Sequence, residues 1–190
     1  MLSRSESPAL RGRLGEEYTE ITDPSIQSRV RTRHNLKIAP LQALGFQHFS
    51  YRLEALPPYS AISKFPIVLM MFSKEVLVFP KPARLGIANI LLTHSTPSTI
   101  AECLGLGVKF YSVFSDGTLL ISSSFRSALA PPSNSQIIQN PHCQNADEAW
   151  SAHRQKAAQL GAQGLTARNL ASFADYVEIE RIKLGMVNQA

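Results

Sequence analysis

The stretch GVKFYSVFSDGTLLISSSF, residues 107–125, decides which fold the sequence predicts. It consists of two runs of β-compatible side chains with the dipeptide Asp116-Gly117 between them. Asp-Gly is typical of the tight turn of a β-hairpin, because both central residues of that turn must adopt a positive φ. We therefore expect an antiparallel hairpin that turns at residues 115–118.

Residues 46–53 are the first segment along the chain that has the pattern of a strand. Its apolar and polar side chains alternate, which is the pattern of a half-buried strand. The more apolar set contains Phe49 and Tyr51. We therefore expect a first strand in which His48 and Arg52 face water.

Further apolar runs lie between this strand and the hairpin. Residues 65–72 and 76–79 are separated by three polar residues, which predicts a second hairpin. The first of these runs is apolar at every position, so we expect it to be covered on both faces. Residues 85–93 fit a strand or a helix, and their position favours a strand. Residues 93–107 fit either a single helical turn or a continuation of the sheet.

The last third of the sequence is typical of helices. Asn145 followed by Glu148 is a helix-start pattern, in which the Asn caps the helix and the carboxylate reaches back. Thr166 is expected to cap a second helix. Helices after a run of strands predict an α+β fold, with a mostly antiparallel sheet of about five to six strands and the two C-terminal helices packed on one face.

The N-terminal segment differs in character from the rest of the chain. Residues 1–36 lack a sustained apolar period, so we expect a flexible polar and basic N-terminal arm. Asp23 and Pro24 could start a short helix in this arm, over residues 24–31. Residues 37–190 are expected to form a single α+β domain, since a domain of ~150 residues buries enough surface to be stable alone.

The composition limits the class of protein. Hydrophobic residues make up 44% of the chain, which is enough for a core without disulfides or a structural metal. Two cysteines are too few for a disulfide framework, and no apolar run approaches the ~20 residues that cross a bilayer. We expect a cytoplasmic protein without a transmembrane segment. The net charge of +5 is spread along the chain, apart from one dense basic cluster at residues 29–34.

The cysteines and histidines suggest two kinds of chemistry. Cys103, His142, Cys143 and His153 are residue types that bind zinc, but they lack the paired spacing of zinc ligands. A nucleophilic cysteine would need Cys103 beside His94 or His153, and no known catalytic motif surrounds Cys103. We therefore expect no metal and no cofactor. A small enzyme that uses Cys103 and His153 stays an alternative.

Four residues are candidates for ligand binding: Trp150, His153, Tyr111 and Arg126. Trp150 and His153 belong to the first C-terminal helix, and pockets tend to form between a helix and a sheet. Tyr111 and Arg126 could share a face of the sheet, where exposed aromatic rings can stack on bases. The alternative for the aromatic residues is packing in the core.

The run KFYSVFSDGTLLISSSF, preceded by Leu44-Gly45-Phe46 and followed by Trp150-x-x-His153-Arg154, resembles an uncharacterised family of bacterial proteins. The resemblance covers about residues 41–185 and implies a strand–Asp-Gly–strand hairpin with C-terminal helices. That family carries no assigned activity, so the resemblance implies no functional residues. Many of its members have N-terminal membrane helices, whereas this chain has a polar N-terminal segment.

These observations predict a binding or interaction module without catalysis, whose partner is a protein or a small molecule. The small enzyme is a second hypothesis. A third is a nucleic-acid binder that works through Arg29, Arg31 and Arg33 of the basic arm. The third hypothesis predicts affinity that falls steeply with salt and depends on residues 1–37.

Overall fold

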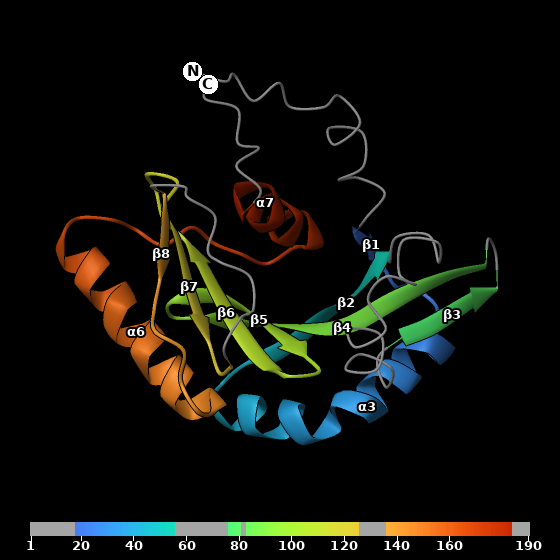
Figure 1. The fold of residues 1–190 in the computed structure, drawn as a ribbon. Coiled ribbons are helices and arrows are strands. Elements are labelled where there is room, and N and C mark those ends of the chain that lie inside the picture. Colours follow the sequence, from blue (N-terminus) through green and yellow to red (C-terminus); the bar gives the residue numbers. More distant parts are fainter. Residues whose placement is uncertain (1–17, 56–75, 81–82, 126–135, 184–190) are drawn as a thin grey trace, which may run out of the picture.

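A twisted β-sheet forms the middle of the molecule (Figure 1). The computed structural model describes residues 18–55, 76–80, 83–125 and 136–183. Within these ranges the sheet has eight strands in the order β1-β2-β4-β5-β6-β7-β8, and β3 pairs with β4. The strands are β1 (Tyr18–Glu20), β2 (Gln47–Ala55), β3 (Val76–Pro80), β4 (Ala83–Ser95), β5 (Ser98–Leu104), β6 (Gly107–Val113), β7 (Leu119–Ser123) and β8 (Ile137–Gln139).

Every strand pair is antiparallel except β7 with β8, which is parallel. The expected mostly antiparallel sheet is therefore confirmed, with more strands than the five to six predicted. The described residues also form the helices α3 (Pro24–Ala43), α6 (Ala146–Ala162) and α7 (Phe173–Lys183). The α+β class is confirmed as well.

The hairpin at residues 107–125 forms as expected, but Asp116 does not adopt the positive φ that the predicted turn requires at both central residues. Strands β6 and β7 pair up to Val113 opposite Leu119, and Gly117 in the turn has a φ of 84°. The Asp116 carboxylate accepts hydrogen bonds from the Thr118 N–H at 2.9 Å and from the Thr118 hydroxyl at 2.8 Å. Asp116 is thus a turn-forming residue, because a short polar side chain that binds the backbone two residues on stabilises such turns.

The strands upstream are only partly as expected. Residues 46–53 and 85–93 lie largely in β2 and β4, residues 76–79 lie in β3, and the undecided residues 93–107 contain β5. The predicted strand at residues 65–72 lies outside the described residues.

The prediction that Arg52 faces water is wrong. Arg52 is buried, whereas His48 is exposed as expected. A bulge between His48 and Ser50 changes the parity of β2, so a simple alternation does not hold along this strand. Burial of the guanidinium is tolerated because the Glu102 carboxylate forms an ion pair with it.

The helices cover both faces of the sheet, in contrast to the expected packing on one face. Helices α3 and α6 lie on one side and α7 on the other (Figure 1). Adjacent residues of the central strands are buried on opposite faces, as Leu91 and Leu92 show in β4 and Phe110 and Tyr111 in β6. A sheet that is apolar on both faces needs cover on both.

The N-terminal segment is more ordered than the expected arm in the part that the structure describes. Strand β1 pairs with β2, and α3 spans twenty residues, so the boundary at residue 36 falls inside a helix. The Asp23 carboxylate caps α3 by accepting the N–H groups of Ser25 at 2.8 Å and Ile26 at 3.3 Å. The helix packs on the sheet through its buried residues Val30, His34, Ile38 and Leu41.

Local capping interactions explain where the C-terminal helices begin. Asn145 accepts the Glu148 N–H at 2.9 Å, and the Glu148 carboxylate accepts the Gln144 N–H at 3.0 Å, which confirms this helix start. The second helix begins after Ser172 rather than after Thr166, because Ser172 and Asp175 form reciprocal hydrogen bonds. The Thr166 carbonyl instead accepts the Ser115 N–H at 2.8 Å, which ties that segment to the hairpin turn.

Candidate functional site

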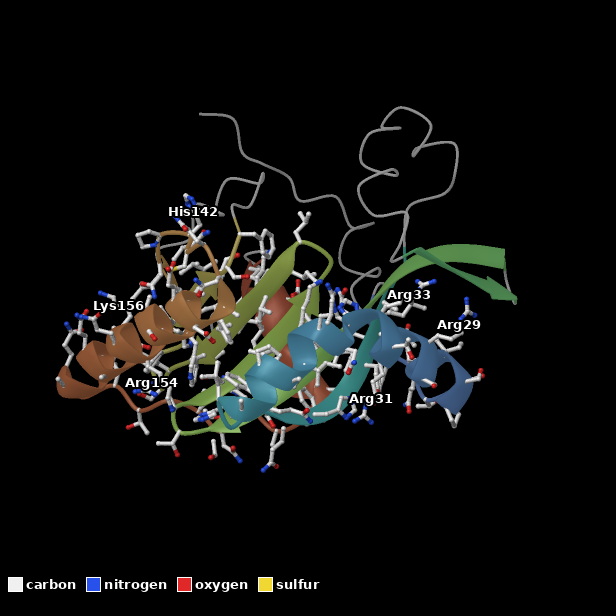
Figure 2. The ribbon with its side chains drawn as sticks, turned by 90° about the horizontal axis from the view of Figure 1, so that it is seen from below. Arg29, Arg31, Arg33, His142, Arg154 and Lys156 are labelled. Atoms are coloured by element: carbon white, nitrogen blue, oxygen red, sulfur yellow. The ribbon has the colours of Figure 1, made fainter. Side chains whose placement is uncertain are left out.

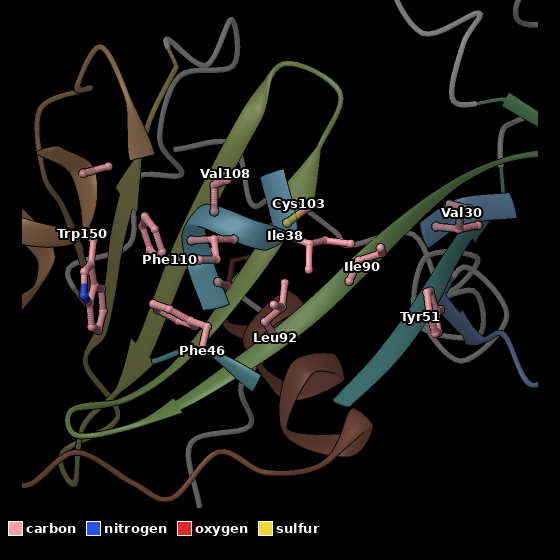
Figure 3. Packing of buried hydrophobic residues seen from close by; sticks show 14 of the residues in the cluster. Val30, Ile38, Phe46, Tyr51, Ile90, Leu92, Cys103, Val108, Phe110 and Trp150 are labelled. Atoms are coloured by element: carbon pink, nitrogen blue, oxygen red, sulfur yellow. The ribbon is translucent and has the colours of Figure 1, made fainter. Parts of the chain in front are cut away.

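The Trp150 side chain projects from α6 into a buried aromatic cluster and does not line a cleft (Figure 3). It is 2% exposed, and its ring centroid is 4.7 Å from Phe46, 5.4 Å from Phe110 and 4.9 Å from His94. These distances are those of tilted and edge-on aromatic packing in a core. The position of Trp150 therefore favours a structural role.

His153 is also buried, in a closed hydrogen-bond network. Its Nε2 is 3.0 Å from Ser112 Oγ and its Nδ1 is 2.9 Å from Ser122 Oγ. Asn140 donates to Ser122 Oγ at 2.9 Å, and Ser112 Oγ donates to the Ser98 carbonyl at 2.8 Å. If His153 is neutral with the proton on Nε2, the imidazole donates to Ser112 Oγ and accepts from Ser122 Oγ, so both ring nitrogens are hydrogen-bonded. Burial lowers the pKa of His153 to about 3, which agrees with a neutral ring.

Tyr111 belongs to a buried polar cluster on the opposite face of the sheet. Its hydroxyl donates to the Glu102 carboxylate at 2.9 Å, and the Asn89 amide donates to the same carboxylate at 3.1 Å. Arg52 forms an ion pair with Glu102, with side-chain exposures of 5% and 2%. Burial, followed by the charge of Glu102, raises the pKa of Tyr111 well above its ordinary value. Tyr111 is thus a neutral donor in the core and not an exposed stacking platform.

Helix α7, which covers this face of the sheet, adds further polar residues to the same cluster. Glu180 accepts the Tyr176 hydroxyl at 2.8 Å and forms an ion pair with Lys183 at 2.6 Å. Burial alone would raise the pKa of Glu180, but the charges of Lys183 and Arg52 outweigh it and lower that pKa to about 2. The Lys183 ammonium lies 5.2 Å from the Tyr111 ring centroid. These interactions hold α7 against the sheet through charges as well as through apolar contacts.

Cys103 does not meet the requirements of a nucleophile. Its side chain is buried in the apolar cluster below α3, and burial raises the pKa of the thiol to about 12. A reactive cysteine needs a lowered pKa and access to substrate. Within the described ranges, no group of three or more His, Cys, Asp or Glu side chains is placed to hold a metal ion. Arg126, the fourth candidate for ligand binding, lies outside the described residues.

An open groove of about 710 Å³ runs beside α6, between that helix, the turn at Thr96 and Pro97, and the segment around residues 165–167. The helix that was expected to line a cleft therefore does so, but with other residues. The polar residues of the groove are Thr96, Ser151, Arg154, Gln155 and Thr166, and its remaining lining is mainly apolar. Among the described residues that line the groove, none is acidic.

The most distinctive surface feature is the outer face of α3 (Figure 2). Arg29, Arg31 and Arg33 are exposed, and no ion pair involves them in the part of the chain that the structure describes. The sequence contains no acidic residue between Asp23 and Glu54. The positive charge of this helix is therefore uncompensated along its own length.

Helix α6 places two further cations on the same side of the molecule (Figure 2). Arg154 and Lys156 project from α6, and His142 lies in the segment before it (Figure 2). Asp147 and Glu148 at the start of α6 balance these two cations within that helix. We therefore place the candidate site on α3, and regard α6 as flanking it.

The sequence drew attention to Arg29, Arg31 and Arg33, but it did not show that they project from an ordered helix. The signal that could have shown this is the spacing of Val30, His34, Ile38 and Leu41, since residues three and four apart share one helix face. His34 interrupts the apolar character of that stripe. Its buried imidazole Nε2 lies 3.3 Å from the Ala88 carbonyl, which anchors the helix to β4.

Comparison with known protein families, curated proteins and solved structures found no match to this chain. Among the described helices, none combines the length and the apolar character needed to cross a membrane. The candidate site therefore depends on the geometry and charge described above.

The two buried histidines make the stability of the fold depend on pH. Burial lowers the pKa of His153 to about 3 and, with the charge of Lys37, that of His34 to about 4. Between pH 6.5 and 4.5 the unfolded chain therefore binds more protons than the folded chain. The free energy of unfolding should fall by about 1.4 kcal/mol per pH unit for each histidine over this range.

Urea unfolding at pH 7.0, 5.5 and 4.5 tests this expectation. His34→Gln is the informative variant, because it removes one titrating group and should reduce the slope of stability against pH by about half. Glu180 contributes little between pH 7.0 and 5.5, because its pKa is lowered from 4.5 to about 2 in the folded chain and the two states differ in its protonation only at lower pH. A free energy of unfolding that stays constant from pH 7.0 to 4.5 would show that the histidines titrate normally.

Proposed function

We propose that this chain is a binding protein without catalytic activity, and that nucleic acid binds to the outer face of α3. The observation that carries the proposal is the set of three exposed arginines with no ion pair among the described residues and no acidic residue in the helix. Phosphate backbones attract such a surface, and guanidinium groups bind phosphate oxygens well. The cytoplasmic location expected from the sequence is part of the same proposal.

The alternative of a small enzyme has little support from the positions of its two residues. Cys103 and His153 are both 0% exposed, so substrate could reach neither of them without local unfolding. They also belong to separate surroundings, since Cys103 packs under α3 and His153 bonds to Ser112 and Ser122 under α6. Binding therefore remains the better proposal.

The groove beside α6 supports a second candidate, which is binding of a small molecule. Its described lining is mainly apolar, and the exposed Arg154 is the one cationic residue in that part of the lining. A ligand with an apolar body and one anionic group would match this combination. The proposal on α3 is preferred because that helix exposes three arginines, whereas the described lining of the groove contains one cationic residue.

The double substitution Arg29→Gln and Arg33→Gln tests the nucleic-acid proposal. We expect roughly tenfold weaker binding to a 20-base-pair DNA duplex at 0.1 M salt, because two phosphate contacts are lost. The dependence of log affinity on log salt should become shallower by about two. Fluorescence anisotropy of a labelled duplex at several salt concentrations measures both quantities.

The matched control is Arg168→Gln with Arg181→Gln, which removes the same charge on the α7 side of the molecule. Arg168 is exposed and bonded to Glu178, and Arg181 is an exposed residue of α7. We expect this control to keep most of the affinity. Equal losses in the two double variants would mean that only net charge matters, and an absence of binding by the unmodified chain would overturn the proposal.

A further inference from the structure

Helix α3 presents its arginines at two edges of one exposed face. Arg29 and Arg33 are one helical turn apart and therefore lie on the same edge. Arg31 is two residues from each of them, which turns its side chain to the opposite edge. Figure 2 shows this arrangement from the exposed side, with Arg31 on one side of α3 and Arg29 and Arg33 on the other.

The surface between these edges is narrow and mostly uncharged. Ser28, Thr32, Asn35 and Leu36 occupy it, and all four are exposed. A helix with its side chains is about 10–12 Å across, and the major groove of B-form DNA is about 12 Å wide. A helix with cations at both edges and uncharged residues between them matches a groove that has a phosphate strand on each side.

We propose that α3 lies in the major groove of double-stranded DNA, an inference that rests on the proposed function and names its ligand. Arg29 and Arg33 contact the phosphates of one strand, and Arg31 contacts those of the other. The face between them meets the edges of the bases. Duplex DNA can contact both edges of the helix at once, because it has a phosphate strand on each side of the groove. A single strand has only one phosphate backbone.

The residues between the edges carry the chemistry that base edges recognise. The Asn35 side chain makes no hydrogen bond among the described residues, so its amide is available, and Asn pairs with adenine through two hydrogen bonds. Leu36 is 91% exposed and offers an apolar contact of the kind that a thymine methyl group accepts. Thr32 donates its hydroxyl to the Ser28 carbonyl at 2.9 Å, which keeps its side chain close to the helix.

Two other anionic partners fit this face less well. Duplex RNA has the same charge, but its major groove is too deep and narrow for side chains to read. An anionic membrane would require a broad apolar face on the helix, and Leu36 is the only large apolar residue that α3 exposes among the described residues. Both partners serve as comparisons in the test.

The first experiment compares probes of equal length against the full chain. They are a 20-base-pair DNA duplex, the RNA duplex of the same sequence, the single DNA strand, and vesicles with one third phosphatidylserine. We expect at least tenfold tighter binding to duplex DNA than to duplex RNA at 0.1 M salt. A DNA duplex whose cytosines carry glucosylated hydroxymethyl groups, which fill the major groove, should bind at least tenfold more weakly than the plain duplex.

The second experiment widens the helix without changing its charge. Thr32→Trp should weaken binding to duplex DNA at least tenfold while leaving the melting temperature within about 2 °C, because the position is exposed. The matched control is Gln159→Trp, at an exposed position of α6, which should bind as the unmodified chain does.

The outcomes separate this inference from the proposed function. Equal affinity for duplex DNA, duplex RNA and the single strand, with the dependence on Arg29 and Arg33 retained, would overturn the major-groove inference and leave nucleic-acid binding in place. Binding to the vesicles alone, or to none of the probes, would overturn both. Insensitivity to glucosylation and to Thr32→Trp would also overturn the major-groove inference.

Discussion

Replacing Glu102 by alanine is expected to lower the free energy of unfolding by about 3–5 kcal/mol. The carboxylate accepts hydrogen bonds from Tyr111 and Asn89 and forms an ion pair with Arg52, all in the buried layer under α7. Its removal leaves the Arg52 charge in the core without this partner, and the cost of burying such a charge dominates the effect. Urea unfolding followed by circular dichroism measures the change.

The exposed ion pair between Arg168 and Glu178 provides the matched control. Its closest N–O distance is 2.7 Å, but the two side chains are 42% and 40% exposed. Glu178→Ala should therefore cost about 1 kcal/mol or less, because solvent screens exposed pairs. If Glu102→Ala cost no more than Glu178→Ala, the buried cluster would not be a structural element.

The second large effect is expected from Trp150→Ala, at about 3–5 kcal/mol of lost stability. The indole packs against Phe46, Phe110 and His94 and stacks on His153 at a centroid distance of 5.8 Å. Its removal leaves a cavity between α6 and the sheet that these rings cannot fill. Thermal and urea unfolding both report the loss.

This variant also separates the two roles considered for Trp150. A tryptophan that lines a ligand site could be removed with little effect on folding, whereas a core residue cannot. Leu36→Ala is the matched control for apolar area, because Leu36 is 91% exposed and its loss should change stability by no more than about 0.5 kcal/mol. A loss below about 1 kcal/mol for Trp150→Ala would contradict the core assignment.

The strands and turns were the most predictable part of the fold. The Asp116-Gly117 turn and the Asn145 cap depend on a few neighbouring residues, so their chemistry is visible in the sequence. The pairing of β2 with β4 and the faces covered by the helices depend on distant contacts. Periodicity could not show that α6 and α7 lie on opposite sides of the sheet, because the central strands are apolar at both parities.

The buried polar residues were the least predictable part. From the sequence, Arg52 looks like a water-facing residue in an alternating strand. Glu102 lies in residues 93–107, for which the sequence did not decide between a helical turn and a strand. Each becomes understandable only when the partner is known, since the sequence places them fifty residues apart and the sheet brings them together. The same holds for His153, whose serine partners come from β6 and β7.

The candidate site was half predictable. The cluster of Arg29, Arg31 and Arg33 is evident in the sequence, but a flexible arm and an ordered helix present such charges differently. The capped helix fixes which edge each arginine occupies, and it exposes Asn35 and Leu36 between them. Positive charge alone predicts only attraction to phosphate, whereas this arrangement supports the proposal that α3 binds in the major groove of DNA.

The central claim, that nucleic acid binds to α3, is tested most directly by amide NMR spectra of the full chain with a 20-base-pair DNA duplex added. We predict that the largest changes in amide shift fall within residues 28–36, and that residues of α7 change little. Changes centred on α7 or on the groove beside α6, or no changes at 0.1 M salt, would contradict the account.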